Sequence, residues 1–491
     1  MNAFFSRYSI TFVKSLVYML QQSEYDTKEY LSWFKRTGNF NEVMRRKQLD
    51  MTSAAKGFLA FLGLEIAVGG IAVLMLGFSA ASQGWFLGWI VGVIIIGLLV
   101  PYVLAYGLVA PLWLARILIQ RPRQKAQIAR ARSKLVDHPA TKIAIAGSYG
   151  KTTMKETLAM VLGTAKKVAA TPGNMNTPAG ISRFVEELTG DEEILIFEMG
   201  EYYPGDIAVL CELVQPNLGI ITGINEAHLS KFKSLDATVA TIFELADYFQ
   251  DKDQNLKNTL YTNGESHLAA RGPADSRADA PALIYSRGGV GKWKVERAHT
   301  GLDGTSFNLK RGKEVIKVSS LLLGLHQVGP LAAAAAIAAW LGLSLTDIEA
   351  GLARTKPFEH RLQPAIDAGG VITIDDTYNG NPDGARVAIE FLASLEGRKR
   401  YYVTPGLVEM GYRTRDVHVA MGKQLAESGI EVVVLIETSV MPHIKAGLET
   451  AGFKGKLMTY PDEITALMAL PKLTTEGDVV LLQNDWGDNY S

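Results

Sequence analysis

The 491-residue chain has a single cysteine and no excess of charge of either sign. Cys211 excludes an intramolecular disulfide and any zinc site built from cysteines alone, and it fits a reducing compartment. Lys and Arg together number 50, as do Asp and Glu, so the formal net charge is zero. Proteins that bind nucleic-acid backbones normally carry a basic excess, so composition predicts no nucleic-acid partner. The length predicts about two to four domains.

Charged side chains are missing altogether from residue 66 to residue 115. This run is far longer than the ~20 apolar residues that span a bilayer. The small and polar residues 79–85 interrupt it, which predicts a transmembrane helical hairpin with spans near residues 57–79 and 85–107. A buried helical hairpin of a soluble protein is the alternative. A signal peptide is not expected, because the run starts late and comes twice.

Basic residues flank the predicted hairpin, and its connecting loop has none. They are Arg45, Arg46, Lys47 and Lys56 before it and Arg116, Arg121, Arg123 and Lys125 after it. By the positive-inside rule both ends are cytoplasmic, which predicts a multi-pass cell-membrane protein with cytoplasmic catalytic domains. Glu65 falls inside the first span, where a carboxylate is costly. We expect it near the interface or protonated, and a functional role is the alternative.

The two predicted spans lie within residues 57–120, and the segments on either side of them also look helical. Residues 1–56 mix aromatic and charged side chains at helical spacing, which predicts amphipathic helices that lie on the membrane or on the catalytic body. Residues 121–140 form a basic linker. Its positive charges favour anionic lipid headgroups, although a solvated helix explains the same residues.

From residue 141 onward, short apolar runs alternate with helical stretches. KIAIAG (142–147) and NLGIITGI (217–224) are typical of the first half, and VITIDD (371–376) and EVVVLIE (431–437) of the second. Uninterrupted Val, Ile and Leu runs suit strands that are buried on both faces of a parallel sheet. We predict two α/β domains, residues 141–356 and 357–491. Alanine-rich helices within residues 321–355 should close the first sheet.

The stretch AIAGSYGKTTMKE (144–156) lies between an apolar run and a helix-like segment. Its glycines and its helix N-terminus predict a loop whose backbone N–H groups face a phosphate. The common form of this loop is G-x-x-x-x-G-K-[ST]. Ile145 stands where its first glycine would be, so this loop is the shorter G-x-x-G-K-T. The residues expected to bind a nucleotide here are Gly147, Ser148, Tyr149, Gly150, Lys151, Thr152 and Thr153.

This short loop resembles that of the Mur ligases, and further motifs follow in that family's order. They are TPGNMNTPAGI (171–181), FEMGEYYPGDI (197–207), NEAHLSKFKSL (225–235), HRLQP (360–364), DDTYNGNPDG (375–384), and GLVEMG with HVAMG (406–411 and 418–422). The MurF type is the most similar, from about residue 142 to the C-terminus. The resemblance implies a central P-loop ATPase domain, a Rossmann-like C-terminal domain, and a ligase that uses ATP and Mg²⁺. Residues 1–140 do not resemble that enzyme's usual UDP-sugar-binding domain.

The resemblance also implies roles for individual residues. Catalytic residues would be Lys151, Glu198, His228, Asn174, Asn176 and Arg361. Mg²⁺ would be held by Thr152, Glu198 and His228. The nucleotide would also meet Asn263, His326, Arg361, Asp376, Tyr378 and Asn379, with Glu265 and Asn381 beside them. Turn formation is the alternative for Asn174, Asn176 and Asp376. A surface carboxylate at a strand end is the alternative for Glu198, and a structural role is the alternative for His228.

Three parts of the sequence depart from the family's pattern. Ile242 stands where many members have a lysine, carbamylated in the active enzyme, that bridges two metals. Either Glu244 substitutes for it, or only one Mg²⁺ is firmly held. GLHQVGP (324–330) keeps His326 but has Gln327 and Pro330 in place of two asparagines, and QNDWG (483–487) replaces K-G-S-R. The last change removes two cations that would hold an acidic dipeptide partner.

The leading hypothesis is a membrane-tethered, MurF-like ligase that adds D-alanyl-D-alanine or a similar amino component to a cell-wall precursor. A second hypothesis keeps the chemistry but changes the substrate, to another amino acid or to a lipid-linked or polymeric acceptor. A third is a nucleotide-binding membrane scaffold without ligase activity. A Mur-like amidotransferase subunit is less favoured, because the related subunit has a four-cysteine metal ribbon and this chain has one cysteine.

Overall fold

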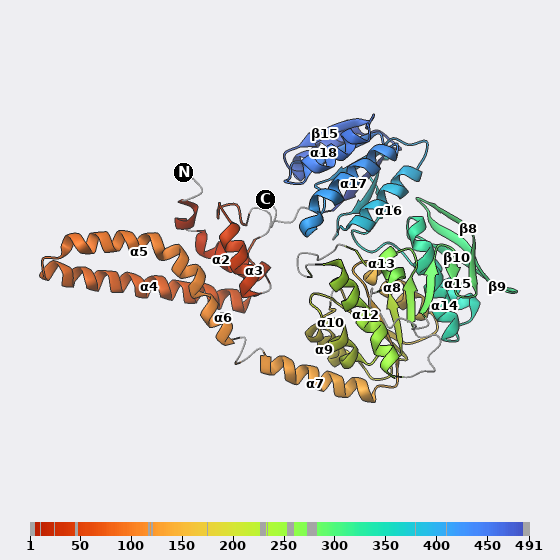
Figure 1. The fold of residues 1–491 in the computed structure, drawn as a ribbon, viewed down its shortest axis with the longest axis horizontal. Coiled ribbons are helices and arrows are strands. Elements are labelled where there is room, and N and C mark those ends of the chain that lie inside the picture. Colours follow the sequence, from red (N-terminus) through yellow and green to blue (C-terminus); the bar gives the residue numbers. More distant parts are fainter. Residues whose placement is uncertain are drawn as a thin grey trace. The chain divides into compact units, whose positions relative to one another are not determined.

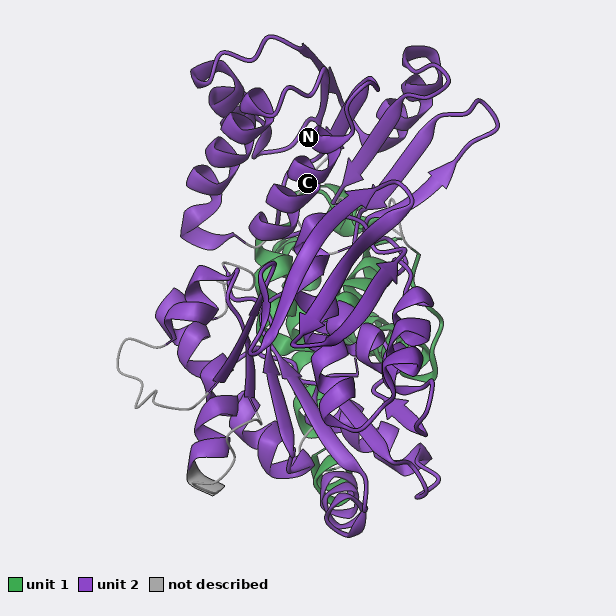
Figure 2. Ribbon diagram, turned by 90° about the vertical axis from the view of Figure 1, so that its right-hand side faces the viewer, with its two compact units in different colours: residues 1–126 green, residues 127–491 purple. Residues whose placement is uncertain are grey.

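The structure is a computed structural model of the chain (Figure 1). It describes residues 5–9, 11–23, 25–44, 48–115, 118, 121–173, 175–225, 232, 234–252, 260–272, 282–378, 380–408 and 410–484. The chain divides into two compact units, residues 1–126 and residues 127–491, which Figure 2 colours separately. Each unit has its own hydrophobic core.

In the described residues of the first unit, all regular secondary structure is helical. A 3-10 turn at Ser6–Tyr8 precedes α2 (Phe12–Gln22), α3 (Thr27–Arg36), α4 (Ser53–Ser82), α5 (Phe86–Gly107) and α6 (Val109–Ala115). The Asp26 side chain caps the start of α3, where it accepts hydrogen bonds from the Lys28 and Glu29 backbone N–H groups at 2.8 and 2.9 Å. Backbone N–H groups at a helix start have no partner within the helix itself. α4 and α5 form the predicted hairpin. Because α4 continues to Ser82, the turn is shorter than predicted and comprises residues 83–85.

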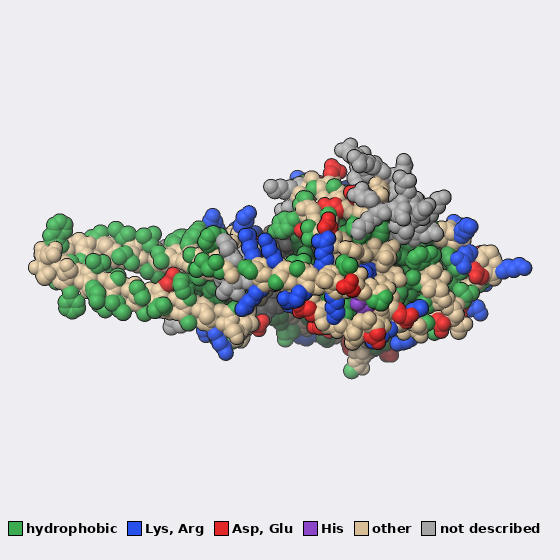
Figure 3. Space-filling model, turned by 90° about the horizontal axis from the view of Figure 1, so that it is seen from below, with side chains coloured by type: hydrophobic (Ala, Val, Ile, Leu, Met, Phe, Trp, Pro, Cys, Tyr) green, Lys and Arg blue, Asp and Glu red, His purple; other side chains and the backbone are tan. Residues whose placement is uncertain are grey.

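Most of the hairpin has no protein cover in its own unit. Of the 30 residues of α4 only Ala55 and Leu62 are buried, and of the 22 residues of α5 only Pro101, Leu104 and Ala105. Hydrophobic side chains cover the visible face of this arm (Figure 3). Two helical stretches are long and apolar enough to cross a membrane. They are Ser53–Ser82, which is α4, and Phe86–Leu114, which comprises α5 and most of α6.

One end of the hairpin packs against α2 and α3. Leu16 and Tyr30 share a hydrophobic cluster with Leu62 of α4 and Leu104 of α5. The Tyr30 hydroxyl donates a hydrogen bond to the Ala105 carbonyl at 3.0 Å. The apolar faces of α2 and α3 therefore meet the hairpin itself, a partner that the sequence analysis did not anticipate.

The second unit begins in α7 (Arg121–Asp137) and contains a ten-stranded sheet in the order β10-β9-β8-β7-β6-β5-β4-β1-β3-β2. The parallel strands are β1 (Thr141–Ala146), β2 (Val168–Ala170), β3 (Ile194–Glu198), β4 (Leu218–Ile221), β5 (Leu260–Asn263) and β6 (Ala282–Ser286). The antiparallel strands are β7 (Gly289–Val290), β8 (Trp293–Gly301), β9 (Gly304–Arg311) and β10 (Glu314–Ser320). The sequence analysis missed this antiparallel part, because β10 alternates buried and exposed residues instead of forming an apolar run.

Helices cover both faces of the parallel strands. One cluster contains α8 (Lys151–Leu162), α14 (Val328–Trp340) and α15 (Leu345–Ala353). The other contains α9 (Pro178–Glu187), α10 (Asp206–Val214), α12 (Leu235–Lys252) and α13 (His267–Arg271), and also the buried Cys211 side chain. Along β1, Ile143 and Ile145 join the first cluster and Ala144 and Ala146 the second. The strand is therefore buried on both faces, as its composition predicts.

The C-terminal domain is a second α/β domain, as predicted. Its sheet has the order β11-β12-β16-β13-β14-β15, in which β11 pairs antiparallel with β12 and the other neighbours pair in parallel. The strands are β11 (Gln363–Ile366), β12 (Ile372–Asp376), β13 (Arg400–Thr404), β14 (Val432–Ile436), β15 (Lys456–Tyr460) and β16 (Val479–Gln483). The helices are α16 (Pro382–Ser394), α17 (Thr414–Glu427), α18 (Met441–Thr450) and α19 (Glu463–Leu473).

Candidate functional site

Polar residues gather where the parallel strands of the first sheet end. β1 ends at Ala146, β3 at Glu198 and β5 at Asn263. Neighbouring parallel strands bring their carboxyl ends to one edge, which is where open α/β sheets bind ligands. The phosphate loop, Glu198 and Asn263 therefore share one edge of the sheet.

The phosphate loop is held against the segment that follows β4. The Ser148 and Tyr149 backbone N–H groups donate to the Gly223 carbonyl at 2.6 and 3.3 Å, and the Thr222 hydroxyl donates to the Tyr149 carbonyl at 2.6 Å. A side chain on Gly147 would overlap the Thr222 hydroxyl. Gly150 has φ of 81°, which favours glycine, and it immediately precedes α8. The unpaired N–H groups of the first turn of α8 therefore open toward the loop.

Lys151, the first residue of α8, forms a buried ion pair with Glu201. Its ammonium lies 3.0 and 2.9 Å from the two Glu201 carboxylate oxygens and also donates to the Gly147 carbonyl. The Lys151 side chain is 12% exposed and that of Glu201 is 2% exposed. The sequence analysis missed Glu201. Its only signal was its position three residues after Glu198, just beyond the end of a strand.

Glu198 is the centre of a second buried group. Its Oε2 accepts from the Thr152 hydroxyl at 3.0 Å and lies 3.3 Å from the Lys155 ammonium. Its Oε1 accepts from the Asn176 side-chain amide at 3.3 Å. Lys155, which is fully buried, also donates to the Gly173 carbonyl at 3.0 Å. The structure thus brings together the predicted residues Thr152, Asn176 and Glu198, and it adds Lys155, one helical turn after Lys151.

The donor set around Glu198 fits Mg²⁺. Hydroxyl and carboxylate oxygens are the ligands that Mg²⁺ prefers, and it usually keeps further positions for phosphate and water. Those of Thr152 and Glu198 are adjacent, and the Lys155 ammonium beside Glu198 shows that this carboxylate already attracts a cation. Within the described ranges no group of three or more His, Cys, Asp or Glu side chains gathers for a metal. A metal here would therefore rely on phosphate oxygens as well.

The C-terminal domain contributes Arg361 and Asp376. Burial lowers the pKa of Arg361, while the nearby Asp376 and Glu198 carboxylates oppose that shift. Burial raises the pKa of Asp376 to about 7, against Arg361 and hydrogen bonds from the Leu362 N–H and the Gln483 amide. The Arg361 guanidinium lies 5.2 Å from the centre of the Tyr378 ring, within cation–π range.

Two further contacts join the central and C-terminal domains. The Asn225 amide donates to Asn381 at 2.7 Å and to Asp383 at 3.1 Å. Arg287, in the turn after β6, makes two parallel hydrogen bonds to Glu390 of α16, at 2.8 and 3.2 Å. Such paired bonds fix orientation as well as charge. Asn225, Arg287 and Glu390 were not among the predicted site residues, because their pairing across domains leaves no local sequence signal.

The residues predicted near the adenine make contacts with their own neighbours in the structure. Asn263 accepts from the Glu265 N–H at 2.9 Å, and Glu265 in turn accepts from the Arg287 N–H at 3.0 Å, so both serve a local turn. Burial lowers the pKa of His326 to about 4, and the Arg287 charge adds to the shift. His326 is therefore neutral at neutral pH, and its ring hydrogen-bonds the Gln327 amide at 2.9 Å.

The positions related to a second metal serve other contacts or lie outside the described residues. Ile242 is fully buried in a hydrophobic cluster, so it offers no metal ligand. Glu244 accepts from the Gly205 and Ala208 N–H groups at 2.8 and 2.9 Å and caps α10, which argues against its substitution for the family's lysine. The predicted residues Asn174, His228 and Asn379 lie outside the described residues.

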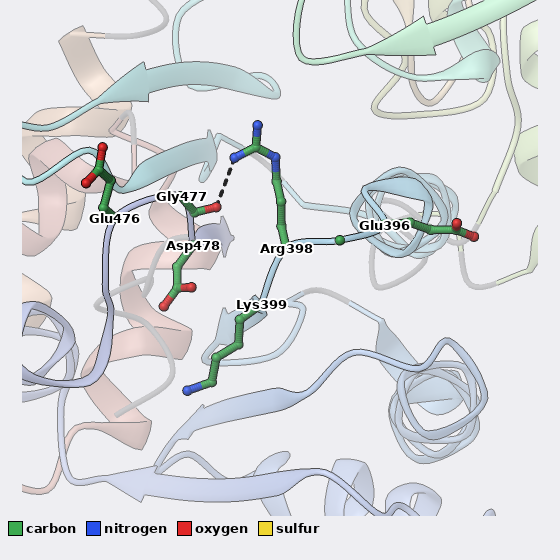
Figure 4. A pocket seen from close by; sticks show the side chains of 7 residues that line it. Glu396, Arg398, Lys399, Glu476, Gly477 and Asp478 are labelled. Carbon is green, nitrogen blue, oxygen red and sulfur yellow. Dashed lines mark hydrogen bonds between the residues drawn. The ribbon is translucent and has the colours of Figure 1, made fainter.

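A polar hollow elsewhere in the C-terminal domain is not part of this site. Figure 4 shows it between the segments that precede β13 and β16, where Arg398 donates to the Gly477 carbonyl at 3.0 Å. It therefore lies at the amino ends of two parallel strands, whereas Asp376 and Tyr378 lie at the carboxyl end of β12. Glu396, Arg398, Lys399 and Glu476 are exposed to solvent and Asp478 is buried, and none of them was predicted as a site residue.

Two family models match the second unit. The Mur ligase middle domain matches residues 145–338, and the Mur ligase glutamate ligase domain matches residues 360–483. Together they cover about two thirds of the chain and confirm the resemblance seen in its motifs.

Individual relatives are of the MurF type, at modest identity. The UDP-N-acetylmuramoyl-tripeptide--D-alanyl-D-alanine ligases of Escherichia coli and Bacillus subtilis are 28% and 26% identical, over 61% and 70% of this chain. The matches cover 65% and 73% of those two proteins. Among solved structures, MurF from Acinetobacter baumannii shares the fold (TM-score 0.64, 24% identity, 74% of this chain and 77% of that one). MurF from Thermotoga maritima, solved in complex with ADP, has a TM-score of 0.61 at 25% identity, with 74% and 80% covered.

Proposed function

The chain belongs to the Mur ligase family, and on this premise we propose that it is a membrane-anchored, ATP-dependent ligase that forms an amide bond on a cell-wall precursor. The observation that carries the proposal is the cluster of Lys151, Thr152 and Glu198 beside the phosphate loop. The relatives are named for the addition of D-alanyl-D-alanine to a UDP-muramoyl tripeptide, so that reaction is the leading candidate.

The chemistry follows from the stability of a carboxylate. An amine does not displace the oxygen of a carboxylate in water, so the oxygen must first become a leaving group. An acceptor carboxylate oxygen attacks the γ-phosphorus of ATP, and ADP leaves. The amine nitrogen then attacks the acyl carbon, phosphate leaves with the C–O bond electrons, and the nitrogen loses a proton.

The residues of the site would divide this work between them. Lys151 and the unpaired N–H groups at the start of α8 would bind the β- and γ-phosphates. Thr152 and Glu198 would hold Mg²⁺, which neutralises phosphate charge. Arg361 would stabilise the charge that develops on the transferred phosphoryl group, and the apposition of the two domains would limit access of water.

Replacement of Lys151 tests the catalytic part of this proposal. Lys151→Ala should abolish ATP-dependent product formation, because the ammonium is the cation nearest to the phosphate loop. The fold should remain, since Lys151 sits at a helix start, but the unfolding midpoint should fall because the buried Glu201 carboxylate loses this ammonium. Product formation by coupled assay and the thermal unfolding midpoint are the measurements. Retention of a tenth or more of the wild-type rate would contradict the assignment.

The membrane anchor is supported by the hairpin's exposed apolar surface and its one-sided basic flanks. We propose that both termini and the catalytic domains are cytoplasmic, with only the turn at residues 83–85 outside. Asp191→Cys, at a side chain that is 69% exposed, should resist a membrane-impermeant thiol reagent added to intact cells. Gln83→Cys should react, whereas native Cys211 is buried. Labelling of Asp191→Cys from outside would reverse the topology.

A second candidate differs only in the acceptor. The family models begin at residue 145, and residues 1–126 form a separate unit with the apolar hairpin. A ligase held at a bilayer could act on a lipid-linked or polymeric acceptor that diffuses in the same surface. Measurement of ATP hydrolysis against a panel of soluble and lipid-linked precursors, each with candidate amino donors, separates the two.

A further inference from the structure

Two lysines and two glutamates form buried ion pairs side by side in the phosphate site. Lys151 and Lys155 lie one turn apart on α8, and Glu198 and Glu201 lie three residues apart at and beyond the end of β3. Lys151 pairs with Glu201 at 2.9 Å, and Lys155 lies 3.3 Å from Glu198. Both carboxylates are almost fully buried, at 2% and 5% side-chain exposure. Within these two pairs, each ammonium is therefore matched by a carboxylate before any phosphate enters the site.

The Lys151–Glu201 pair uses the lysine that phosphate needs. Both carboxylate oxygens of Glu201 contact the one ammonium, which also donates to the Gly147 carbonyl of the phosphate loop. A nucleotide must draw this ammonium away from Glu201 or share it. Glu201 then loses much of its attraction to the Lys151 ammonium, whatever its other contacts are. The separation of an ion pair that has little solvent exposure is costly.

The incoming nucleotide makes the loss worse. Its polyphosphate adds several negative charges next to the Glu201 carboxylate, and like charges at short range in a partly dry site repel strongly. A divalent cation near Glu201 would offset both effects at once. Carboxylate oxygens are suitable ligands for Mg²⁺, and Ile242 and Glu244 supply none from α12, since one is buried and the other caps α10.

We infer that Glu201 is a further cation-binding residue of this site: it holds Lys151 before the nucleotide binds, and it takes a divalent cation once phosphate draws the lysine away. This inference rests on the proposed function, because it assumes that the loop binds a nucleotide. It assigns to Glu201 a coupling between nucleotide and metal. Nucleotide should bind weakly without a divalent cation, and the cation should restore binding through this carboxylate.

Glu201→Gln tests the coupling, because it keeps the shape of the side chain and removes its charge. The affinity for a non-hydrolysable ATP analogue is measured by calorimetry on the full chain in detergent, once with EDTA and once with Mg²⁺. In the variant, the metal-free affinity should rise about tenfold, because Lys151 is released from its competitor. The gain in affinity on addition of Mg²⁺ should fall by a similar factor. Glu201→Ala should behave in the same way.

Glu192→Gln is the matched control. Glu192 is also a buried carboxylate in a buried pair, with His138 at 3.1 Å, but it precedes β3 and so lies at the opposite end of the strand from Glu201. It should leave both affinities unchanged even if it lowers the unfolding midpoint.

Two results would overturn the inference. One is an unchanged ratio of the affinities with and without Mg²⁺ in both Glu201 variants. The other is a parallel loss of both affinities, which would make Glu201 merely structural. Failure of the wild type to bind the analogue under any condition would instead overturn the proposed nucleotide-dependent function.

Discussion

Helices that are apolar on every side occur in both units, but only one unit buries them. In α14 of the catalytic unit, ten of 13 residues are buried, and Ala332–Ala335 are fully covered by neighbouring elements. In α4 of the first unit, two of 30 residues are buried. The two helices have similar composition and opposite surroundings. Composition therefore indicates that an apolar helix needs nonpolar surroundings. Only the fold shows whether the rest of the protein provides those surroundings.

The sharpest way to break this comparison is to place one charge in each helix. Ala334→Arg puts a long cation into a fully buried position of α14 and should prevent the catalytic unit from folding, at a cost above about 4 kcal/mol. Val68→Arg, at a position 57% exposed in the hairpin, should leave nucleotide binding intact. It should instead weaken membrane insertion, since arginine at a span centre costs about 2.5–3.5 kcal/mol.

Soluble yield, the unfolding midpoint and the fraction of chain resistant to carbonate extraction measure the two effects. Val68→Leu is the matched control in the hairpin, because it keeps the apolar surface and should behave as wild type. Complete membrane retention of Val68→Arg would show that the apolar surface of α4 is not what holds the chain in the membrane.

Deletion of residues 1–121 sharpens the comparison at the level of function. The catalytic unit has its own core, so ATP binding should stay near the wild-type value. A hairpin that confines enzyme and acceptor to one surface raises effective concentration without new contacts. The rate on a membrane-borne acceptor should therefore fall about 10- to 100-fold more than the rate on a soluble one.

The measurement is kcat/KM in liposomes and in solution, with deletion of residues 1–11 as the control that keeps the hairpin. Equal losses on both acceptors would reduce the hairpin to an anchor. No loss on either would leave the first unit without a role in catalysis.

The smallest effect concerns pH, which should act on buried polar groups of the catalytic unit and not on apolar surface. Burial raises the pKa of Asp376 from 3.8 to about 7. A raised folded-state pKa means that the proton favours the folded state. Its stabilising contribution is complete below about pH 4 and is lost as the pH rises through about 7.

Asp376→Asn carries a neutral group at every pH and should lack this loss. The unfolding midpoint of the wild type relative to the variant should fall by a few degrees between about pH 5 and about pH 8. Parallel curves for the two proteins would show that Asp376 is ionised in the folded state over the whole range.

Much of the fold followed from local pattern. The Val, Ile and Leu runs of β1, β3, β4, β12 and β14 predicted parallel strands, because only strands covered on both faces tolerate such composition. The antiparallel strands β8–β10 escaped prediction, since β9 and β10 alternate buried and exposed residues and β8 is mostly exposed, so none of them forms an apolar run.

The site divides in the same way. By itself the sequence determined the phosphate loop, the apolar hairpin and the strand-end position of Glu198, because each depends on residues close together in the chain. Only the tertiary structure decided that Lys151 meets Glu201, that Lys155 meets Glu198 and that Arg287 meets Glu390. These pairs join segments 43 to 103 residues apart, and side chains so distant come within ion-pair range only after the strands align and the two domains meet.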